Sequence, residues 1–259
     1  MKSVKAYLSL VLGVPLALFL LLFFYTPLVV LAYTVFRVQE GSKLFTPIDV
    51  ITNPTYLSVL AFSGEVALIT TICTLLVAYP VALYVGLYSR GLERIALVVL
   101  LVTPFWIDVL LRTWSLRTLL YSIGIREGYL AMIIGMVYDY LPFMFIPLAI
   151  SLMRVPPNVL DAARTLGARP HQVLARVVLP LSAPGVAVGS LLVFLMSYTE
   201  IVIPSLLGGV TGATVGVAIY RLFLEADLWN EGATLALVAT ALGVTVAVLT
   251  RRAAERVGV

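Results

Sequence analysis

The chain has 259 residues, of which 61% are hydrophobic and only 12% charged, with a mean hydropathy of +1.08 and a formal net charge of +4. A soluble domain of this length could not bury so many apolar side chains, so the composition excludes a soluble globular protein and predicts a polytopic membrane protein. Backbone groups inside lipid must pair within the chain, which predicts an all-α fold of membrane-spanning helices. We treat residues 1–259 as a single transmembrane domain.

Six segments are long and apolar enough to cross a bilayer, which requires roughly 20 residues. The first lies within Tyr7–Phe36. A cleaved signal peptide is the alternative there, because Lys2 and Lys5 precede it, but the stretch exceeds a signal core and lacks a small-x-small exit. The other five predicted spans are Ser63–Ser89, Ile95–Leu111, Tyr129–Leu152, Leu181–Pro204 and Gly232–Thr250.

The distribution of Lys and Arg predicts the orientation, because short cytoplasmic loops collect these residues. With the N terminus inside, eleven of the 17 fall on the cytoplasmic side. Those eleven are Lys2, Lys5, Arg90, Arg94, Arg154, Arg164, Arg169, Arg176, Arg251, Arg252 and Arg256. The remaining six are Arg37, Lys43, Arg112, Arg117, Arg126 and Arg221. Both termini are therefore predicted to be cytoplasmic, and the positive charge reflects topology rather than nucleic-acid binding.

Few residues of the chain could carry chemistry. Cys73 and His171 are the only cysteine and histidine, so the sequence offers no disulfide, no His or Cys metal cluster and no Ser-His-Asp triad. It also lacks the Gly-x-x-x-x-Gly-Lys-Ser/Thr phosphate loop. We expect no cofactor and no catalytic residue, and any ATP that drives this protein must bind another subunit.

The third span and the loop after it contain Thr-Pro-Phe-Trp-Ile-Asp-Val-Leu-Leu-Arg-Thr-Trp-Ser-Leu, residues 103–116. Pro104 removes a backbone donor and can kink the helix, and Trp106 is typical of a membrane-interface anchor, as is Trp114. Arg112 could pair with Asp108 or with lipid phosphate, or could simply fix the depth of the helix. The same three possibilities apply to Arg117.

Asp139 is the least expected residue, because it lies roughly 15 Å into the fourth span at 1.5 Å per residue, where a charge is costly. It is a candidate for the substrate pathway, and an internal ion pair or a helix–helix hydrogen bond is the alternative.

Glu65, Asp108 and Glu200 fall near the outer ends of spans two, three and five, where they could make the entrance acidic. Such an entrance would attract a cation, with cation–π contacts from nearby tyrosines. Solvation at a helix end is the alternative for each acid. Together with Trp106 and Asp139, these three acids form our candidate substrate pathway.

Residues 156–180 form the one ordered polar stretch. Asn158 can cap a short helix with Asp161 at its third position, Gly167 can end that helix in the left-handed conformation, and Pro170 can open a second one. The helix would present a small apolar face made of Val159, Leu160, Ala163 and Leu166. Two interpretations remain open from the residues alone: a surface for a partner protein, or a helix lying on the lipid.

The spacing of this stretch resembles the EAA loop of ABC importer permeases, which reads Glu-Ala-Ala, three residues, Gly, nine residues, Ile, one residue, Leu-Pro. The matching positions are Asp161, Ala162, Ala163, Gly167, Val177, Leu179 and Pro180. Asp replaces Glu and Val replaces Ile, which keeps charge and shape. The resemblance implies that residues 156–180 form a cytoplasmic coupling loop that docks on an ATP-hydrolysing subunit.

Residues 103–116 are also similar to the Thr-Pro-Phe-Trp signature of spermidine and putrescine importer permeases, and Glu200–Gly209 resembles a stretch of their B-type subunit. This resemblance implies the type I importer permease fold, alternating access, and a location in the cytoplasmic membrane of a prokaryote. It also implies a second homologous permease, two ATP-binding subunits and an extracytoplasmic substrate-binding protein as partners. Relatives that carry 2-aminoethylphosphonate or ferric iron share parts of these motifs.

Two rival functions belong to other classes. A proton-coupled carrier could use Asp139 as a relay, but the sequence shows no convincing inverted repeat and the ordered loop would then have no role. A membrane-embedded hydrolase is disfavoured by the single His171 and by the lack of clustered metal ligands.

Overall fold

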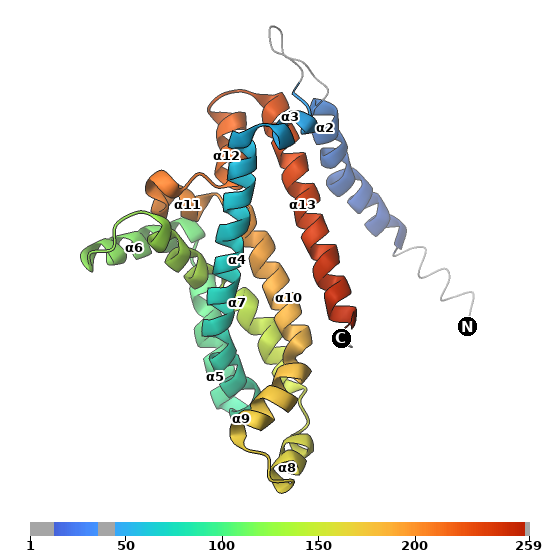
Figure 1. The fold of residues 1–259 in the computed structure, drawn as a ribbon, viewed down its shortest axis with the longest axis vertical. Helices are drawn as coiled ribbons and strands as arrows, with labels where there is room; N and C mark the ends of the chain where they lie inside the picture. The colour runs from blue at the N-terminus through green and yellow to red at the C-terminus, as the bar shows by residue number, and fades with distance from the viewer. Residues whose placement is uncertain (1–12, 36–44, 257–259) are drawn as a thin grey trace. The chain divides into compact units, whose positions relative to one another are not determined.

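The structure is a computed structural model that describes residues 13–35 and 45–256, shown in Figure 1. The described residues are predominantly helical and contain no β-strand, which confirms the predicted all-α class. The α-helices are α2 (Thr26–Val35), α3 (Pro47–Thr52), α4 (Pro54–Leu83), α5 (Gly91–Val102), α6 (Val109–Ser122), α7 (Tyr129–Met153), α8 (Pro157–Thr165), α9 (Pro170–Val173), α10 (Leu179–Tyr198), α11 (Val202–Leu207), α12 (Val215–Leu224) and α13 (Trp229–Arg256). The wider π-helical turns are Leu20–Tyr25, Tyr84–Tyr88 and Leu174–Val178. The tighter 3₁₀ turns are Thr103–Trp106 and Gly209–Thr211.

Five helical stretches within the described residues are long and apolar enough to cross a membrane, and a bent pair of helices makes a sixth. The five are Gly13–Val35, Pro54–Tyr88, Tyr129–Met153, Pro170–Tyr198 and Trp229–Arg252. They correspond to predicted spans one, two, four, five and six. Among the cations used to predict the orientation, Lys2, Lys5, Arg37 and Lys43 lie outside the described residues.

The third predicted span is not one straight helix. Gly91–Trp106 and Val109–Ser122 meet at an angle of 97°. The first helix tightens into the 3₁₀ turn that contains Pro104, whose missing N–H weakens the helical ladder. Ile107 is extended, and Asp108 then starts α6 by accepting a hydrogen bond from Leu110 N at 2.9 Å. The span predicted over Ile95–Leu111 is therefore bent close to the kink expected at Pro104, but its first helix ends before Leu111 because the Asp108 cap begins a new helix.

The fifth span also ends earlier than predicted. Its helix stops at Tyr198, and Pro204 lies buried within the separate helix α11 instead of ending the span. Helix α11 stops at Leu207, and Gly208 and Gly209 follow it.

The chain divides into two compact units. Unit 1 contains the described residues up to Leu57 together with Ile219–Thr240, and unit 2 contains Ser58–Ala218 with the described residues from Ala241 onward. The residues that carry the functional predictions all belong to unit 2, so its packing positions the site.

Within unit 1, polar contacts at the start of α13 hold the segments of this unit together. Asn230 is 6% exposed; its side-chain oxygen accepts a hydrogen bond from Phe45 N at 2.8 Å, and its amide nitrogen donates to Val35 O. The Tyr56 hydroxyl donates to Glu231 at 2.7 Å. These bonds satisfy buried polar groups and connect segments that are far apart in the sequence.

A local cap starts helix α3. Thr46 donates to the Asp49 carboxylate from both its backbone N–H and its hydroxyl, each at 2.7 Å. The side-chain hydrogen bond from Thr46 is the main reason that the pKa of Asp49 lies below its usual value.

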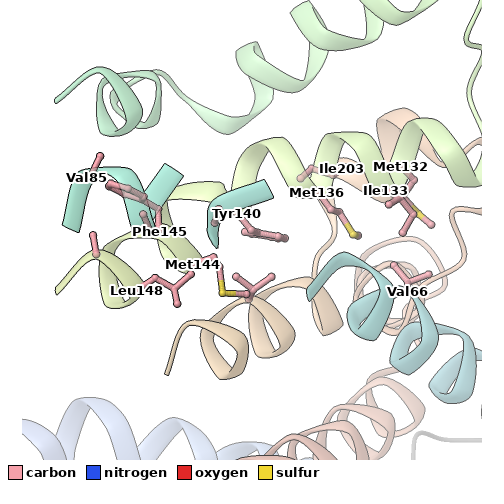
Figure 2. Packing of buried hydrophobic residues seen from close by; sticks show 14 of the residues in the cluster. Val66, Val85, Met132, Ile133, Met136, Tyr140, Met144, Phe145, Leu148 and Ile203 are labelled. Atoms are coloured by element: carbon pink, nitrogen blue, oxygen red, sulfur yellow. The ribbon is translucent and has the colours of Figure 1, made fainter. Parts of the chain in front are cut away.

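Helix α7 forms the centre of unit 2. Every fourth residue along one ridge is at most 1% exposed; this ridge consists of Met132, Met136, Tyr140, Met144, Leu148 and Leu152. Figure 2 shows labelled residues of this ridge packed near Val66, Val85 and Ile203, which come from neighbouring helical segments. A four-residue ridge is the surface by which helices interlock in ridges-into-grooves packing.

Helix α10 lies directly against α7 because its contact face carries Gly185 and Gly189. A Cβ atom built on Gly185 would lie 2.6 Å from Pro147 O, and one on Gly189 would lie 2.8 Å from Met144 Sδ and 3.1 Å from Met144 O. The Gly-x-x-x-Gly spacing therefore allows the two backbones to approach closely, as it does at helix contacts in membranes.

Candidate functional site

The polar segment 156–180 folds into the predicted helix, turn and helix, but the first helix starts at a different residue. Helix α8 begins at Pro157, and Pro156 occupies the cap position with no side-chain hydrogen bond. The prediction that Asn158 caps this helix was wrong. Pro157 has the fixed φ angle that suits the first helical position, so it starts the helix and places Asn158 inside the first turn.

The predicted end of α8 is confirmed in detail. Gly167 has a φ of +80°, the left-handed conformation that glycine adopts without steric cost. Gly167 N donates to Arg164 O at 2.9 Å, and Ala168 N donates to Ala163 O at 3.1 Å. This pair of bonds is a Schellman motif, which satisfies the last carbonyl groups of the helix and turns the chain sharply away.

The two faces of α8 differ. Leu160 and Ala163 pack against the core of unit 2, whereas the Leu166 side chain is 88% exposed. Asp161 and Ala162 are also exposed. The predicted apolar face is thus divided: part of it holds α8 to the bundle, and Leu166 remains available to a partner together with Val159, which is 39% exposed.

Leu179 and Pro180, the last two residues of the predicted coupling pattern, lie at the start of α10. Pro170 opens α9 as predicted, and the chain then runs through the π-helical turn Leu174–Val178 into α10 without a loop. Pro180 has no backbone N–H and therefore cannot donate a helical hydrogen bond, and the wider π turn directly precedes it. Leu179 and Pro180 therefore lie on a different helix from Asp161, Ala162 and Ala163.

Asp139 lies deep in unit 2, where it forms an ion pair. It is 5% exposed, and its Oδ1 atom lies 2.8 Å from Arg112 Nη2. The pair is close but poorly aligned, since neither Asp139 Oδ1 nor Arg112 Nε has a hydrogen-bond partner within the described chain. The Phe105 ring covers the guanidinium, with Arg112 Cζ 5.0 Å from the ring centroid. Arg112 thus pairs with Asp139 and not with Asp108.

Glu200 lies beside the same region and has two structural roles. Its Oε1 accepts hydrogen bonds from Val202 N at 2.8 Å and Ile203 N at 3.4 Å, which caps α11. Its other carboxylate oxygen accepts from the Tyr140 hydroxyl. Because Tyr140 follows Asp139 on α7, the structure brings the two acids to one part of the bundle.

The other candidate pathway residues have separate surroundings. Glu65 is exposed and accepts a hydrogen bond from the Tyr129 hydroxyl at 3.2 Å. Asp108 is exposed and caps α6, and Trp106 is 86% exposed. Within the described residues no three Asp, Glu, His or Cys side chains gather in a group that could hold a metal ion.

Two of the arginines that follow the third predicted span have ion-pair partners. Arg112 pairs with Asp139, and Arg117 forms an ion pair with Glu127 while its Cζ lies 4.9 Å from the centroid of Trp114. These contacts account for the positions of two of the three arginines that follow the third span on the predicted outer side, which are Arg112, Arg117 and Arg126.

Two features were not predicted from the sequence. Arg112 was not recognised as the partner of Asp139, although a buried acid in one span requires a cation from another. The Gly185-x-x-x-Gly189 pattern was also missed, and its spacing in an apolar segment is a direct signal of close helix packing.

Comparison with known proteins identifies the family. Residues 2–257 match the family described as "Binding-protein-dependent transport system inner membrane component". The chain belongs to this family. It is 30% identical to the spermidine/putrescine transport system permease protein PotB of Salmonella typhimurium (strain SL1344), covering 93% of this chain and 91% of that protein. It is 34% identical to PotB of Haemophilus influenzae, covering 83% and 82% respectively.

The fold of this permease is similar to that of a chain in the crystal structure of a bacterial alginate ABC transporter in complex with a periplasmic protein bound to alginate pentasaccharide. The TM-score is 0.77 with 16% sequence identity, covering 99% of this chain and 97% of the other. The permease therefore has the type I importer permease fold predicted from its sequence.

This permease is a multi-pass inner-membrane component of an ABC importer that depends on a binding protein. It acts with other components, and ATP hydrolysis is carried out by a separate subunit, so the chain is not itself an enzyme.

Proposed function

We propose that this permease forms part of the translocation path for a polyamine such as spermidine or putrescine. The observation that carries the proposal is the 30–34% identity, over most of the chain, to permeases named for spermidine and putrescine transport. Spermidine and putrescine, which these names mention, are cations, and this agrees with the acidic residues that the sequence predicts at the outer entrance. Because a polyamine is a chain of ammonium groups and methylenes, it is attracted by carboxylates and by aromatic faces.

The described contacts suggest different roles for the candidate acids. Arg112 compensates the charge of Asp139, whereas neither Glu65 nor Glu200 has an ion-pair partner within the described residues. In our proposal, Glu65, Asp108 and Glu200 attract the cation, with Trp106 beside the entrance. Asp139 takes part once its pairing with Arg112 changes during the transport cycle.

We also propose that residues 156–180 are cytoplasmic, as are both termini, and that α8 is the helix through which an ATP-binding subunit drives the bundle. The exposed Asp161 and Leu166 support this role, as does the Gly167 turn that holds α8 in place. A second permease, two ATP-binding subunits and an extracytoplasmic binding protein would complete the importer. Closure of the ATP-binding subunits would open the path outward, and hydrolysis would return it inward.

An uptake experiment tests the cargo. The permease would be expressed with the transport genes that adjoin its own in cells that lack polyamine uptake, and the entry of labelled spermidine, putrescine, 2-aminoethylphosphonate and ferric iron would be measured. We expect ATP-dependent uptake of a polyamine only. Uptake of the phosphonate or of iron instead would contradict the polyamine proposal, and uptake driven by a proton gradient without ATP would support the carrier alternative.

Crosslinking tests the role of α8. Cys73 is the only cysteine, so Cys73→Ala gives a background without thiols into which Ala162→Cys can be introduced on the exposed face of α8. We expect the Ala162→Cys variant to crosslink to a cysteine-bearing ATP-binding subunit. The matched variant Val210→Cys, at a residue that is fully exposed on the predicted outer side, should not crosslink. Equal crosslinking of both variants would contradict the assignment.

A further inference from the structure

A polar pocket lies in unit 2 where the start of α5, the end of α7 and α8 meet. Its volume is about 410 Å³. Arg90, Arg94 and Arg164 line it, and Asp161 is the single carboxylate among the lining residues. The pocket therefore carries an excess of positive charge that no other lining residue neutralises.

Arg94 has an unused donor at this place. Its Nη2 atom donates to Ser89 O at 2.5 Å, but its Nε atom is buried and has no hydrogen-bond partner within the described chain. Because a buried unpaired guanidinium donor is costly, Arg94 retains hydrogen-bonding capacity beside the cavity that the described chain does not use.

The N-terminus of α5 adds to the positive potential. Arg90 is at the cap position of this twelve-residue helix, and its side chain makes no capping hydrogen bond. Free backbone N–H groups and the helix dipole favour an anion at such a position. Glu93 lies in that turn, but its carboxylate accepts a hydrogen bond from the Tyr84 hydroxyl at 2.7 Å.

A second, apolar pocket of about 220 Å³ adjoins the first. The two share Leu87, Tyr88, Leu160 and Arg164 in their linings. Beyond these shared residues the second pocket is lined mainly by aliphatic side chains, which include Leu83, Val173 and Leu174. A ligand that fills both pockets needs an anionic group joined to a hydrocarbon chain.

We propose that the paired pockets bind one anionic phospholipid. Its phosphate contacts Arg90, Arg94, Arg164 and the first turn of α5, and one acyl chain lies between Leu83 and Leu174. Basic pockets between membrane helices at the predicted cytoplasmic side suit such headgroups. Because Leu160 and Arg164 of α8 line both pockets, the lipid supports the helix that we propose for coupling, and membrane composition would influence the position of α8.

The test uses the full-length permease purified in detergent and measures bound lipid by native mass spectrometry. The probes are phosphatidylglycerol, phosphatidylcholine and inorganic phosphate. We expect phosphatidylglycerol to bind in a 1:1 complex and far more tightly than phosphatidylcholine. Arg90→Gln with Arg164→Gln should weaken it by roughly 30-fold, the effect of removing two cationic contacts at a membrane surface. Arg176→Gln is the matched control, since Arg176 belongs to the same polar segment but lines neither pocket.

A second variant separates a lipid from a free phosphate. Leu174→Trp should fill the apolar pocket and reduce the binding of phosphatidylglycerol while the arginines remain. Binding of inorganic phosphate that is as tight as that of the lipid, and unaffected by this variant, would overturn the lipid assignment. Equal affinity for phosphatidylglycerol and phosphatidylcholine would also overturn the proposal. So would a result in which Arg90→Gln with Arg164→Gln left lipid binding unchanged and weakened only the binding of an ATP-binding subunit.

Discussion

Arg112 and Asp139 form a buried ion pair between α6 and α7, with Nη2 and Oδ1 2.8 Å apart and side chains that are 6% and 8% exposed. The two residues lie on consecutive helices that are joined by the loop between Ser122 and Tyr129, and the sharp bend before α6 sets the direction in which Arg112 approaches α7. The pair explains how a charged group is retained deep in an apolar bundle, because each residue supplies the charge that the other requires.

Removing one member of this pair should destabilise the permease strongly. Arg112→Gln leaves the Asp139 carboxylate buried without its cation, and we expect the free energy of unfolding to fall by about 3–5 kcal/mol. Thermal unfolding in detergent would measure the loss. Arg112→Met with Asp139→Leu is the control, because it removes both charges and should recover most of the stability.

The same variants test whether Asp139 belongs to the transport path. We expect Asp139→Asn to lower uptake per assembled importer, because a carboxylate that attracts the cation is lost; dividing uptake by the amount of assembled complex separates this effect from the loss of stability caused by the unpaired Arg112. The Arg112→Met, Asp139→Leu variant should remain inactive even though it is stable. If uptake were unchanged in both variants, the ion pair would be purely structural and Asp139 would be removed from the pathway.

The close contact between α7 and α10 can be tested at Gly189. A methyl group there would lie 2.8 Å from Met144 Sδ and 3.1 Å from Met144 O, so Gly189→Ala should separate the helices and cost about 1–3 kcal/mol. Gly64→Ala is the control, because its Cβ meets open space within α4 and alanine favours helix. The Tm should fall in the first variant and stay equal or rise in the second. A Tm that changed equally in both would argue against close packing at Gly189.

The turn at Gly167 should control coupling between ATP hydrolysis and uptake. Valine disfavours a φ of +80°, so Gly167→Val should disrupt the Schellman motif and displace α8. We expect uptake to fall while the spans still insert and the ATP-binding subunits still hydrolyse ATP. Gly167→Asn should retain more uptake, since asparagine tolerates the left-handed conformation. Full uptake by the valine variant would contradict the role of the turn.

Leu166 should contribute to the binding of a partner and not to folding. Its side chain is 88% exposed, so Leu166→Gln should change the free energy of unfolding by no more than about 0.5 kcal/mol. If the ATP-binding subunit buries Leu166, its affinity should fall by roughly tenfold or more. A pull-down titration with purified ATP-binding subunit measures this, with Val210→Gln as the exposed control. Unchanged affinity for the Leu166 variant would place the contact elsewhere on α8.

The amino-acid sequence determined the class of this protein and its local structure. The apolar content predicts membrane helices, because unpaired backbone groups cannot remain in lipid. The end of α8 was predictable at Gly167 because a helix that turns sharply needs a left-handed residue, and glycine is the residue that adopts it most easily. Such features depend on residues that are close together in the chain.

Other features were decided only by the tertiary structure. Pattern analysis placed Asp139 in a span but could not choose between a substrate contact and an ion pair, because the partner lies on another helix. The end of the third span was missed because Asp108 was interpreted only as an acid at the outer end of that span, whereas its side chain caps the first turn of a new helix. The division of the α8 face between Leu160, packed inward, and Leu166, exposed, likewise depends on where the core of unit 2 lies. Periodicity identifies an apolar face, but only the packing of distant segments determines which of its residues remain free to bind a partner.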